Sequence, residues 1–407
     1  MGNFRWLHLS DLHFRMCEGF DMSLILEQLE NVLKKAAEIA KFKFIFLTGD
    51  LADCFDYTMV EPRIKKMLLE SEILEDNGNI FWVCGNHDIP RKKKHRDREI
   101  AEIRDKSMRD VTFEGEFADD ESKGILLNAF NEFYKVREIL LGMKKFDDYP
   151  HQVIHTDDAE IVLLNTCITS CNDDDEHKLY LCEPKLINLF NEIQQGKPVF
   201  VLGHHSLNYL ADSDRTRLLS LFREKNVSVY LCGHAHQLGI QPLSENIQEI
   251  VSGGFKTDGY AVISFIIGSY DEEHIEYELM PYTYRFGSKS WGEDYCAASG
   301  MEKDKKYQVS LFNKESKEKL TDTIIRAERL FQGITSFDKI DVKIFNQIGE
   351  RVLREYVQVL LDEKNIENMD FEALCEVAVQ NGSKKINYPS LKMEKFLADI
   401  WRFRDNL

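Results

Sequence analysis

The chain has 407 residues, of which 43% are hydrophobic and 30% charged, a composition typical of a globular protein with a large core and more than one domain. A net charge of −18 argues against broad, non-specific coating of nucleic acid, although bound divalent cations can reverse the field around a local site. No apolar run approaches the roughly 18 residues of a membrane-spanning helix, so we expect no membrane association.

Cysteine usage and the start of the chain bear on the cellular compartment. The nine cysteines include no CxxC pair, and several lie in apolar runs, such as Cys84, Cys167 and Cys232. This pattern indicates reduced, buried thiols and disfavours a zinc–thiolate site. The chain begins with a strand-like segment rather than a signal peptide, so we expect a cytoplasmic protein.

Strand-like and helix-like segments alternate in the first 240 residues. Apolar residues recur at helical spacing over 24–40 and 212–225, and Pro184 suits the first position of a further helix. Short runs rich in β-branched or aromatic residues suit strands that are buried on both faces. They lie at 4–9, 42–47, 80–84, 161–165, 199–202 and 227–232. The alternation predicts an α/β domain.

The pattern changes after residue 239. Strand-like runs at 249–251, 260–267 and 274–280 are separated by turn sequences, which predicts antiparallel strands that complete a second sheet. We therefore assign residues 1–285 to one domain. Residues 286–316 are rich in glycine, serine and charge, which suits a linker or extended tail. Helical patterns then predict a separate small helical domain over 317–407.

One long segment, residues 91–158, separates two predicted strands of the first domain and exceeds the length of a simple loop. It opens with a basic run at 91–98, continues through an acidic stretch and ends in a helical pattern at 126–141. We interpret it as an insertion that could cap a site. The basic run suits either a solvated helix face or contacts to substrate phosphates.

Polar motifs follow five of the strand-like runs, where the carboxyl edge of an α/β sheet binds ligands. Aspartate and histidine together suit Mn²⁺, iron or Zn²⁺, and the absence of cysteine from these motifs argues against a structural zinc site. A carboxylate such as that of Asp50 can bridge two ions, and ions about 3.5–4 Å apart can bind phosphoryl oxygens and generate a hydroxide nucleophile. The motifs are Asp11-Leu12-His13, Gly49-Asp50-Leu51-Ala52-Asp53, Gly85-Asn86-His87-Asp88, Gly203-His204-His205 and Gly233-His234-Ala235-His236.

In their order DxH, GDxxD, GNHD, a histidine pair and GHxH, these motifs resemble the calcineurin-like metallophosphoesterase family over about residues 4–280, apart from the insertion. The resemblance implies an α/β fold in which a two-sheet β-sandwich is flanked by helices. It also implies ligands for two divalent ions, with Mn²⁺ as the first expectation and iron, Zn²⁺ or Ni²⁺ as alternatives. The implied ligands are Asp11, His13 and His236 for the first ion, Asn86, His204 and His234 for the second, and Asp50 as the bridge.

The resemblance further implies that His87 lies near the metals without binding them and assists departure of the leaving oxygen. Asp88 could orient the His87 ring. Whether His205 is also a ligand stays open. Asp53 could hydrogen-bond a ligand or cap the following helix.

The GNHD motif occurs in family members that cleave diesters, whereas the family's protein phosphatases usually carry GNHE. Residues 8–13 are most similar to the cyclic-nucleotide phosphodiesterase branch, but the insertion and the C-terminal helices depart from its small members. The leading hypothesis is a phosphodiesterase for a nucleotide or nucleic acid, which uses a metal-bound hydroxide. The alternatives are a phosphomonoesterase, a nuclease subunit with a protein partner, and a non-catalytic scaffold. The C-terminal helices could bind a partner or mediate self-association.

Overall fold

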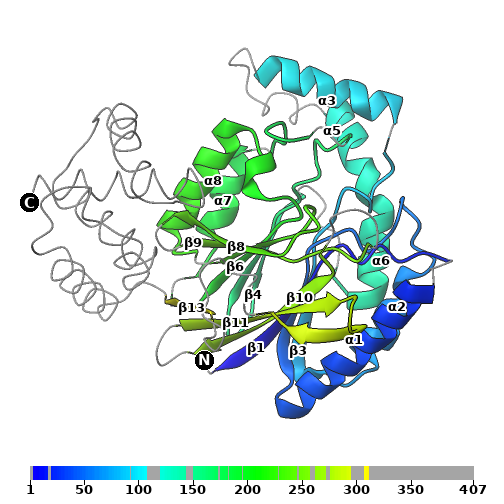
Figure 1. Cartoon of the computed structure of the whole chain (residues 1–407). Coiled ribbons are helices and arrows are strands. Elements are labelled where there is room, and N and C mark those ends of the chain that lie inside the picture. Colours follow the sequence, from blue (N-terminus) through cyan, green and yellow to red (C-terminus); the bar gives the residue numbers. More distant parts are fainter. Residues whose placement is uncertain are drawn as a thin grey trace, which may run out of the picture. The chain divides into compact units, whose positions relative to one another are not determined.

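The computed structural model describes the chain between residues 3 and 310 with gaps (Figure 1). The described ranges are 3–16, 20–91, 93–107, 120–143, 150–172, 175–181, 183–194, 196–227, 229–244, 247–256, 262–271, 276–294 and 307–310. The chain divides into two units, Met1–Leu311 and Phe312–Leu407. The helical domain expected at 317–407 therefore lies outside the described residues.

The first sheet has the strand order β12-β11-β10-β1-β2-β3, and β13 also pairs with β11. Its centre is parallel, because β1 pairs with β2 and β2 with β3 in the same direction. β10 then runs antiparallel to β1, and β11 antiparallel to β10. The bounds are Phe4–Leu9 (β1), Phe42–Leu47 (β2), Leu74–Trp82 (β3), Ser264–Asp271 (β10), Glu276–Arg285 (β11), Ser290–Glu293 (β12) and Tyr307–Ser310 (β13).

The second sheet has the order β4-β5-β6-β7-β9-β8. Strands β5, β6, β7 and β9 are parallel, and the two edge strands are antiparallel to their neighbours. The bounds are Gln152–His155 (β4), Glu160–Leu163 (β5), Val199–Leu202 (β6), Val229–Cys232 (β7), Gly239–Ser244 (β8) and Ile247–Val251 (β9).

The expectation for the strands after residue 239 was partly wrong. β9 does join the second sheet but runs parallel to β7, while β10 and β11 extend the first sheet from β1. The reason is physical: alternating apolar residues indicate a strand but carry no information on which distant strand it will pair with.

An aromatic core lies between the two sheets. Trp6 and Phe46 of the first sheet pack on Phe200 of the second, with ring centroids 5.8 and 5.1 Å apart. All three side chains are fully buried. Burying a large apolar side chain contributes about 1.5–3 kcal/mol, so this layer holds the two sheets face to face.

Helices cover both outer faces of the sheets, as Figure 1 shows. α1 (Phe20–Ile39) and α6 (Asn131–Leu141) pack on the first sheet, where Phe133 lies edge-on to Trp82. α7 (Glu183–Asn191) and α8 (Asp212–Glu224) pack on the second sheet. The expected α/β sandwich flanked by helices is thereby confirmed. None of the helices among the described residues is long and apolar enough to cross a bilayer.

Further helices complete the described part of the chain. They are α2 (Val60–Ile64), the π-helix η1 (Lys65–Leu69), α3 (Lys94–Ser107), α5 (Asp120–Leu127) and the 3₁₀ helices η2 (Asn128–Phe130) and η3 (Leu207–Tyr209).

The segment expected as an insertion, 91–158, contributes to both layers. Its α6 buries Phe133 and Leu140 against the first sheet, and its β4 forms an edge of the second. Among the described residues of this segment, α3 and α5 add to this frame, and they pack on each other and on Ile168, which follows β5. In the range expected as a linker, 286–316, β12 and β13 pair with β11. Short edge strands of this kind carry little apolar periodicity.

Candidate metal centre

The loops that follow the parallel strands are tied together by their backbones. The N–H of Asp11 donates to Gly49 O at 2.9 Å, and that of His13 donates to Asp50 O at 3.0 Å. In the second sheet, the N–H of Gly233, after β7, donates to His204 O, after β6, at 2.9 Å. These bonds place the motifs at the carboxyl ends of the strands, as the α/β alternation predicted.

The first group of donors comprises Asp11, His13 and His236, whose ligand atoms all lie within 4.8 Å of one another. His236 Nε2 is 3.1 Å from Asp11 Oδ1 and 3.2 Å from His13 Nε2. Burial would raise the pKa of Asp11, but the hydrogen bond from His236 and the nearby His204 lower it to about 2. The three side chains therefore present an anionic pocket of one carboxylate and two imidazoles.

The second group surrounds Asn86. Its Oδ1 lies 2.9 Å from His204 Nε2 and 3.1 Å from His234 Nδ1. His204 is oriented from behind, because its Nδ1 lies 2.8 Å from Thr48 O and must carry the proton of that hydrogen bond. Burial would lower the pKa of His204, but Asp50 raises it well above its usual value. The contact between His204 Nε2 and the Asn86 oxygen therefore contains a proton that a bound cation could replace.

Asp50 lies between the two groups. Its Oδ2 is 3.9 Å from His13 Nε2 and 3.4 Å from His204 Nε2. Burial would raise the pKa of this carboxyl, but His204 holds it well below its usual value. One buried carboxylate oxygen thus faces a histidine from each group, which is the place of a bridging ligand.

Five of the seven expected ligands have left-handed backbones. The φ angles are 53° for Asp11, 45° for His13, 52° for Asp50, 66° for His234 and 50° for His236. Residues with a Cβ adopt this conformation rarely, and such strain concentrates at functional sites. The sequence analysis did not predict these left-handed backbones, because none of these residue types by itself indicates one.

Glycines make room for the carboxylates. A Cβ added to Gly85 would lie 2.1 Å from Asp50 Oδ1, so only glycine fits there. Gly49 has a φ of +98°, a backbone conformation that glycine adopts without steric cost. At Gly85, therefore, the missing side chain provides space beside Asp50.

The family model of the calcineurin-like phosphoesterases matches residues 4–238, the range that contains these side chains. The chain belongs to that family. The resemblance seen in the motifs is confirmed, and with it the expectation of a phosphoester substrate.

Known proteins similar to this phosphoesterase are distant in sequence. The uncharacterised metallophosphoesterase-like protein YydB of Bacillus subtilis strain 168 is 25% identical over 329 residues, 76% of this chain and 67% of that protein. A dimetal phosphatase from Danio rerio is 12% identical with a TM-score of 0.43, over 76% of this chain and 99% of that one. The purple acid phosphatase PPD1 of yellow lupin (Lupinus luteus) is 12% identical with a TM-score of 0.41, over 72% and 55%.

His87 of this phosphoesterase stands at the edge of the first donor group. Its ring is edge-on to His13, with centroids 4.9 Å apart, and its side chain is 20% exposed. Its Nδ1 lies 3.8 Å from Oδ1 of Asp53. Burial lowers the pKa of His87, and Lys256 and Arg91 lower it further against the attraction of Asp50. The ring is thus reachable and has two cations nearby.

Asp88 sits elsewhere than expected. Its carboxylate accepts backbone N–H bonds from Asp50 at 2.8 Å, Ala52 at 2.9 Å and Gly85 at 2.9 Å. Burial and Asp50 raise its pKa to about 7. Asp88 therefore ties the loops after β2 and β3 together, and the carboxylate beside the His87 ring is that of Asp53.

The basic run at 91–98 divides into residues with different environments. Arg96 is buried, and its guanidinium donates to the carbonyls of Cys167, Ile168 and Ser170. Arg98 is exposed and pairs with Glu102 one turn along α3. The run is therefore neither wholly a solvated face nor wholly a phosphate contact, because Arg96 anchors α3 to the segment after β5.

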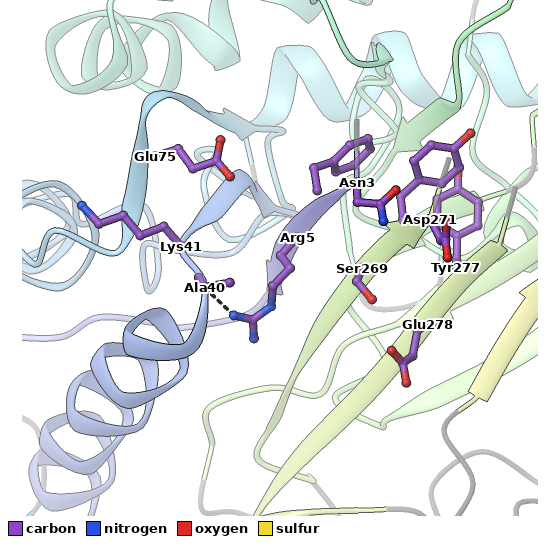
Figure 2. A pocket seen from close by; sticks show the side chains of 11 residues that line it. Asn3, Arg5, Ala40, Lys41, Glu75, Ser269, Asp271, Tyr277 and Glu278 are labelled. Atoms are coloured by element: carbon purple, nitrogen blue, oxygen red, sulfur yellow. Dashed lines mark hydrogen bonds between the residues drawn. The ribbon is translucent and has the colours of Figure 1, made fainter. Parts of the chain in front are cut away.

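A hollow of about 420 Å³ lies at the opposite end of β1, away from the motifs (Figure 2). Arg5 lines it and donates to the carbonyls of Ala36 and Ala40, at the end of α1. Lys41, Glu75 and Glu278 add charges of both signs to its wall. Its Arg5 is thus occupied in capping a helix.

Proposed function

We propose that this chain is a dinuclear-metal phosphodiesterase that hydrolyses a phosphodiester of a nucleotide or nucleic acid. The observation that carries the proposal is the position of Asp50 between two donor groups, with His87 at their edge. One group would hold an ion through Asp11, His13 and His236, the other through Asn86, His204 and His234. We propose Mn²⁺ first, with iron, Zn²⁺ or Ni²⁺ as alternatives.

The donor set fits such ions. His204 Nε2 and His234 Nδ1 both face Asn86 Oδ1, and two imidazole nitrogens meet at 3.2 Å between His13 and His236. Clusters of acceptor atoms this close are favourable when cations lie among them. When bound, the ions supply positive charge for the phosphoryl oxygens and lower the pKa of a bound water.

Residues of the chain would then position the substrate and donate a proton to the leaving oxygen. Asp53 lies on the Nδ1 side of His87 and favours a proton there, so a second proton on Nε2 would make the ring an imidazolium, and that Nε2 proton would be the one donated to the leaving oxygen. Asp88 keeps the Asp50 and Gly85 loops in register through its three backbone bonds. We propose a diester rather than a monoester substrate because of the GNHD sequence. The first alternative is a phosphomonoesterase, followed by a nuclease subunit and a non-catalytic scaffold.

A pair of chromogenic substrates tests the proposal. With Mn²⁺, the protein should hydrolyse bis(p-nitrophenyl) phosphate faster than p-nitrophenyl phosphate, and His87→Ala or Asp50→Asn should abolish turnover. His177→Ala is the matched control, because that histidine is 56% exposed and lies outside the motifs. Preference for the monoester would select the phosphomonoesterase, and an inactive wild type without bound metal would select the scaffold.

The cellular context is also a proposal. Cys84, Cys167 and Cys232 are free and buried, which suits the reducing cytoplasm. The helices expected at 317–407 could bind a protein partner or a second copy of the chain. Mn²⁺-dependent assays on cyclic nucleotides, single-stranded DNA and RNA, and duplex ends would identify the substrate.

A further inference from the structure

His205 is a buried histidine beside the metal centre with one ring nitrogen left over. Its side chain is fully buried, and its Nε2 has no hydrogen-bond partner among the described residues. The ring lies 4.4 Å from that of His234, and one of its nitrogens is within 4.8 Å of nitrogens of His204 and His234. A buried polar atom without a partner is costly, so one at a site points to a missing ligand.

Thr166 determines which nitrogen of His205 carries the proton. Its Oγ1 accepts the backbone N–H groups of His204, at 3.3 Å, and His205, at 3.1 Å. A hydroxyl has two lone pairs and one proton. Both lone pairs are used, so the proton must be donated to His205 Nδ1, which lies 2.9 Å away.

An imidazole that accepts at Nδ1 carries its own proton on Nε2. Such a nitrogen has no free lone pair and cannot bind a metal, although His205 immediately follows the expected ligand His204. The leftover Nε2–H is instead a hydrogen-bond donor without an acceptor in the described part of the protein. Its natural acceptor is an anionic oxygen that arrives with the substrate.

We propose that His205 Nε2–H donates to a non-bridging phosphoryl oxygen of the substrate, on the His234 side of the metal centre. This inference rests on the proposed function and adds a catalytic residue to it. Hydrogen bonds to charged groups are the stronger kind, so loss of this donor should weaken phosphate binding about 10-fold or more.

Two amide substitutions separate the roles of the two ring nitrogens. In His205→Gln the side-chain amide can reach the position of Nε2, whereas in His205→Asn it reaches only that of Nδ1. The full chain is loaded with Mn²⁺, its metal content is measured, and inorganic phosphate is titrated by calorimetry. We expect about two ions in both variants, phosphate binding about 10-fold weaker in His205→Asn, and most of the affinity restored in His205→Gln.

Several results would overturn the assignment. One is wild-type phosphate affinity in His205→Asn; another is loss of one ion in that variant, which would make His205 a metal ligand. ¹⁵N NMR of the wild-type imidazole gives a direct check that needs no variant, and a proton on Nδ1 would also refute the proposal. Because these measurements need no turnover, they remain informative if the wild type hydrolyses no diester, a result that would refute the proposed function alone.

Discussion

Oδ1 of Asp53 lies 3.8 Å from Nδ1 of His87 and 3.7 Å from Nδ1 of His13. The other oxygen of Asp53 is held by Arg15 Nε at 2.7 Å. One carboxylate, fixed from outside, thus stands behind both the proposed proton donor and a proposed metal ligand. Neither distance is yet a hydrogen bond, so a small approach of the rings on substrate binding would complete the contact.

Asp53→Asn should therefore reduce kcat with bis(p-nitrophenyl) phosphate by about 10–100-fold and leave KM and metal content little changed. The reason is that a neutral amide in place of the carboxylate can no longer stabilise a proton on His87 Nδ1. Asp56→Asn is the matched control, because that carboxylate is exposed and, among its described contacts, accepts hydrogen bonds only from the side chain and the backbone N–H of Thr58. An unchanged kcat, or loss of one ion, would contradict this role for Asp53.

Metal removal should destabilise the fold. The centre holds buried carboxylates and five proposed ligands with left-handed backbones, and bound ions would offset these costs. A ligand at about 100 times its Kd adds about 2.7 kcal/mol of stability. Chelation should thus lower Tm by several degrees, and Mn²⁺ should restore it. Asp50→Asn should show a much smaller shift; equal Tm values for the wild type with and without metal would count against the site.

Gly85→Ala should abolish metal binding and activity. The new Cβ would lie 2.1 Å from Asp50 Oδ1 and 2.2 Å from Asp50 N, so this carboxylate, the proposed bridge, must move. Gly124→Ala is the control, since nothing lies within 4 Å of the added Cβ within α5. That variant should be neutral or gain about 0.5–1 kcal/mol from helix propensity. Two bound ions in Gly85→Ala would show that the loop can adapt.

Arg96→Ala should unfold at a lower temperature than the wild type, whereas Arg98→Ala should not. Arg96 donates to three carbonyls in a buried place, and its replacement removes those hydrogen bonds, with only Cys167 O still accepting the backbone N–H of Ser170 among the described contacts. Arg98 is 78% exposed in an i,i+4 pair, which contributes little. Thermal unfolding and KM of both variants check this. If Arg98→Ala alone raised KM, the basic run would contact substrate after all.

His151 should make stability fall with acid. Burial lowers its pKa from 6.5 to about 4 in the folded chain. Between those pH values the unfolded state binds a proton that the folded state does not, so stability is complete above pH 6.5 and decreases as pH falls toward 4. The decrease amounts to about 3 kcal/mol over that window.

Urea unfolding of His151→Gln at pH 7 and pH 5 measures this contribution. The variant should be less stable at pH 7, because His151 receives the N–H of Asn165 and contacts Leu181 O. It should nevertheless lose less stability than the wild type on going to pH 5. His177→Gln, at an exposed position, should keep the wild-type dependence. Identical pH dependence in both variants would exclude His151 as the source.

Part of the candidate site could be predicted from local sequence motifs. Asp11, Asp50 and His204 were recognisable because each follows a buried strand and carries a metal-binding side chain. The structure brings them within 4.8 Å of one another, although they are far apart along the chain. Strand ends meet at one edge of a sheet, so this convergence could be predicted without coordinates.

Other features of the site depend on contacts that no local pattern encodes. Asp88 adjoins His87 in sequence, yet Asp53 is the carboxylate that faces the His87 ring, and Thr166 reaches His205 across 39 positions. Likewise, β10 joined β1 rather than the second sheet.

The sequence by itself determined the candidate metal-binding side chains and the layered α/β architecture, because side-chain type and apolar spacing are local properties of the chain. Only the tertiary structure decided which carboxylate serves His87, which nitrogen of His205 carries a proton and which sheet each late strand joins. Those outcomes depend on pairings between distant segments, where hydrogen-bond geometry in the packed fold selects among partners that look equivalent in sequence.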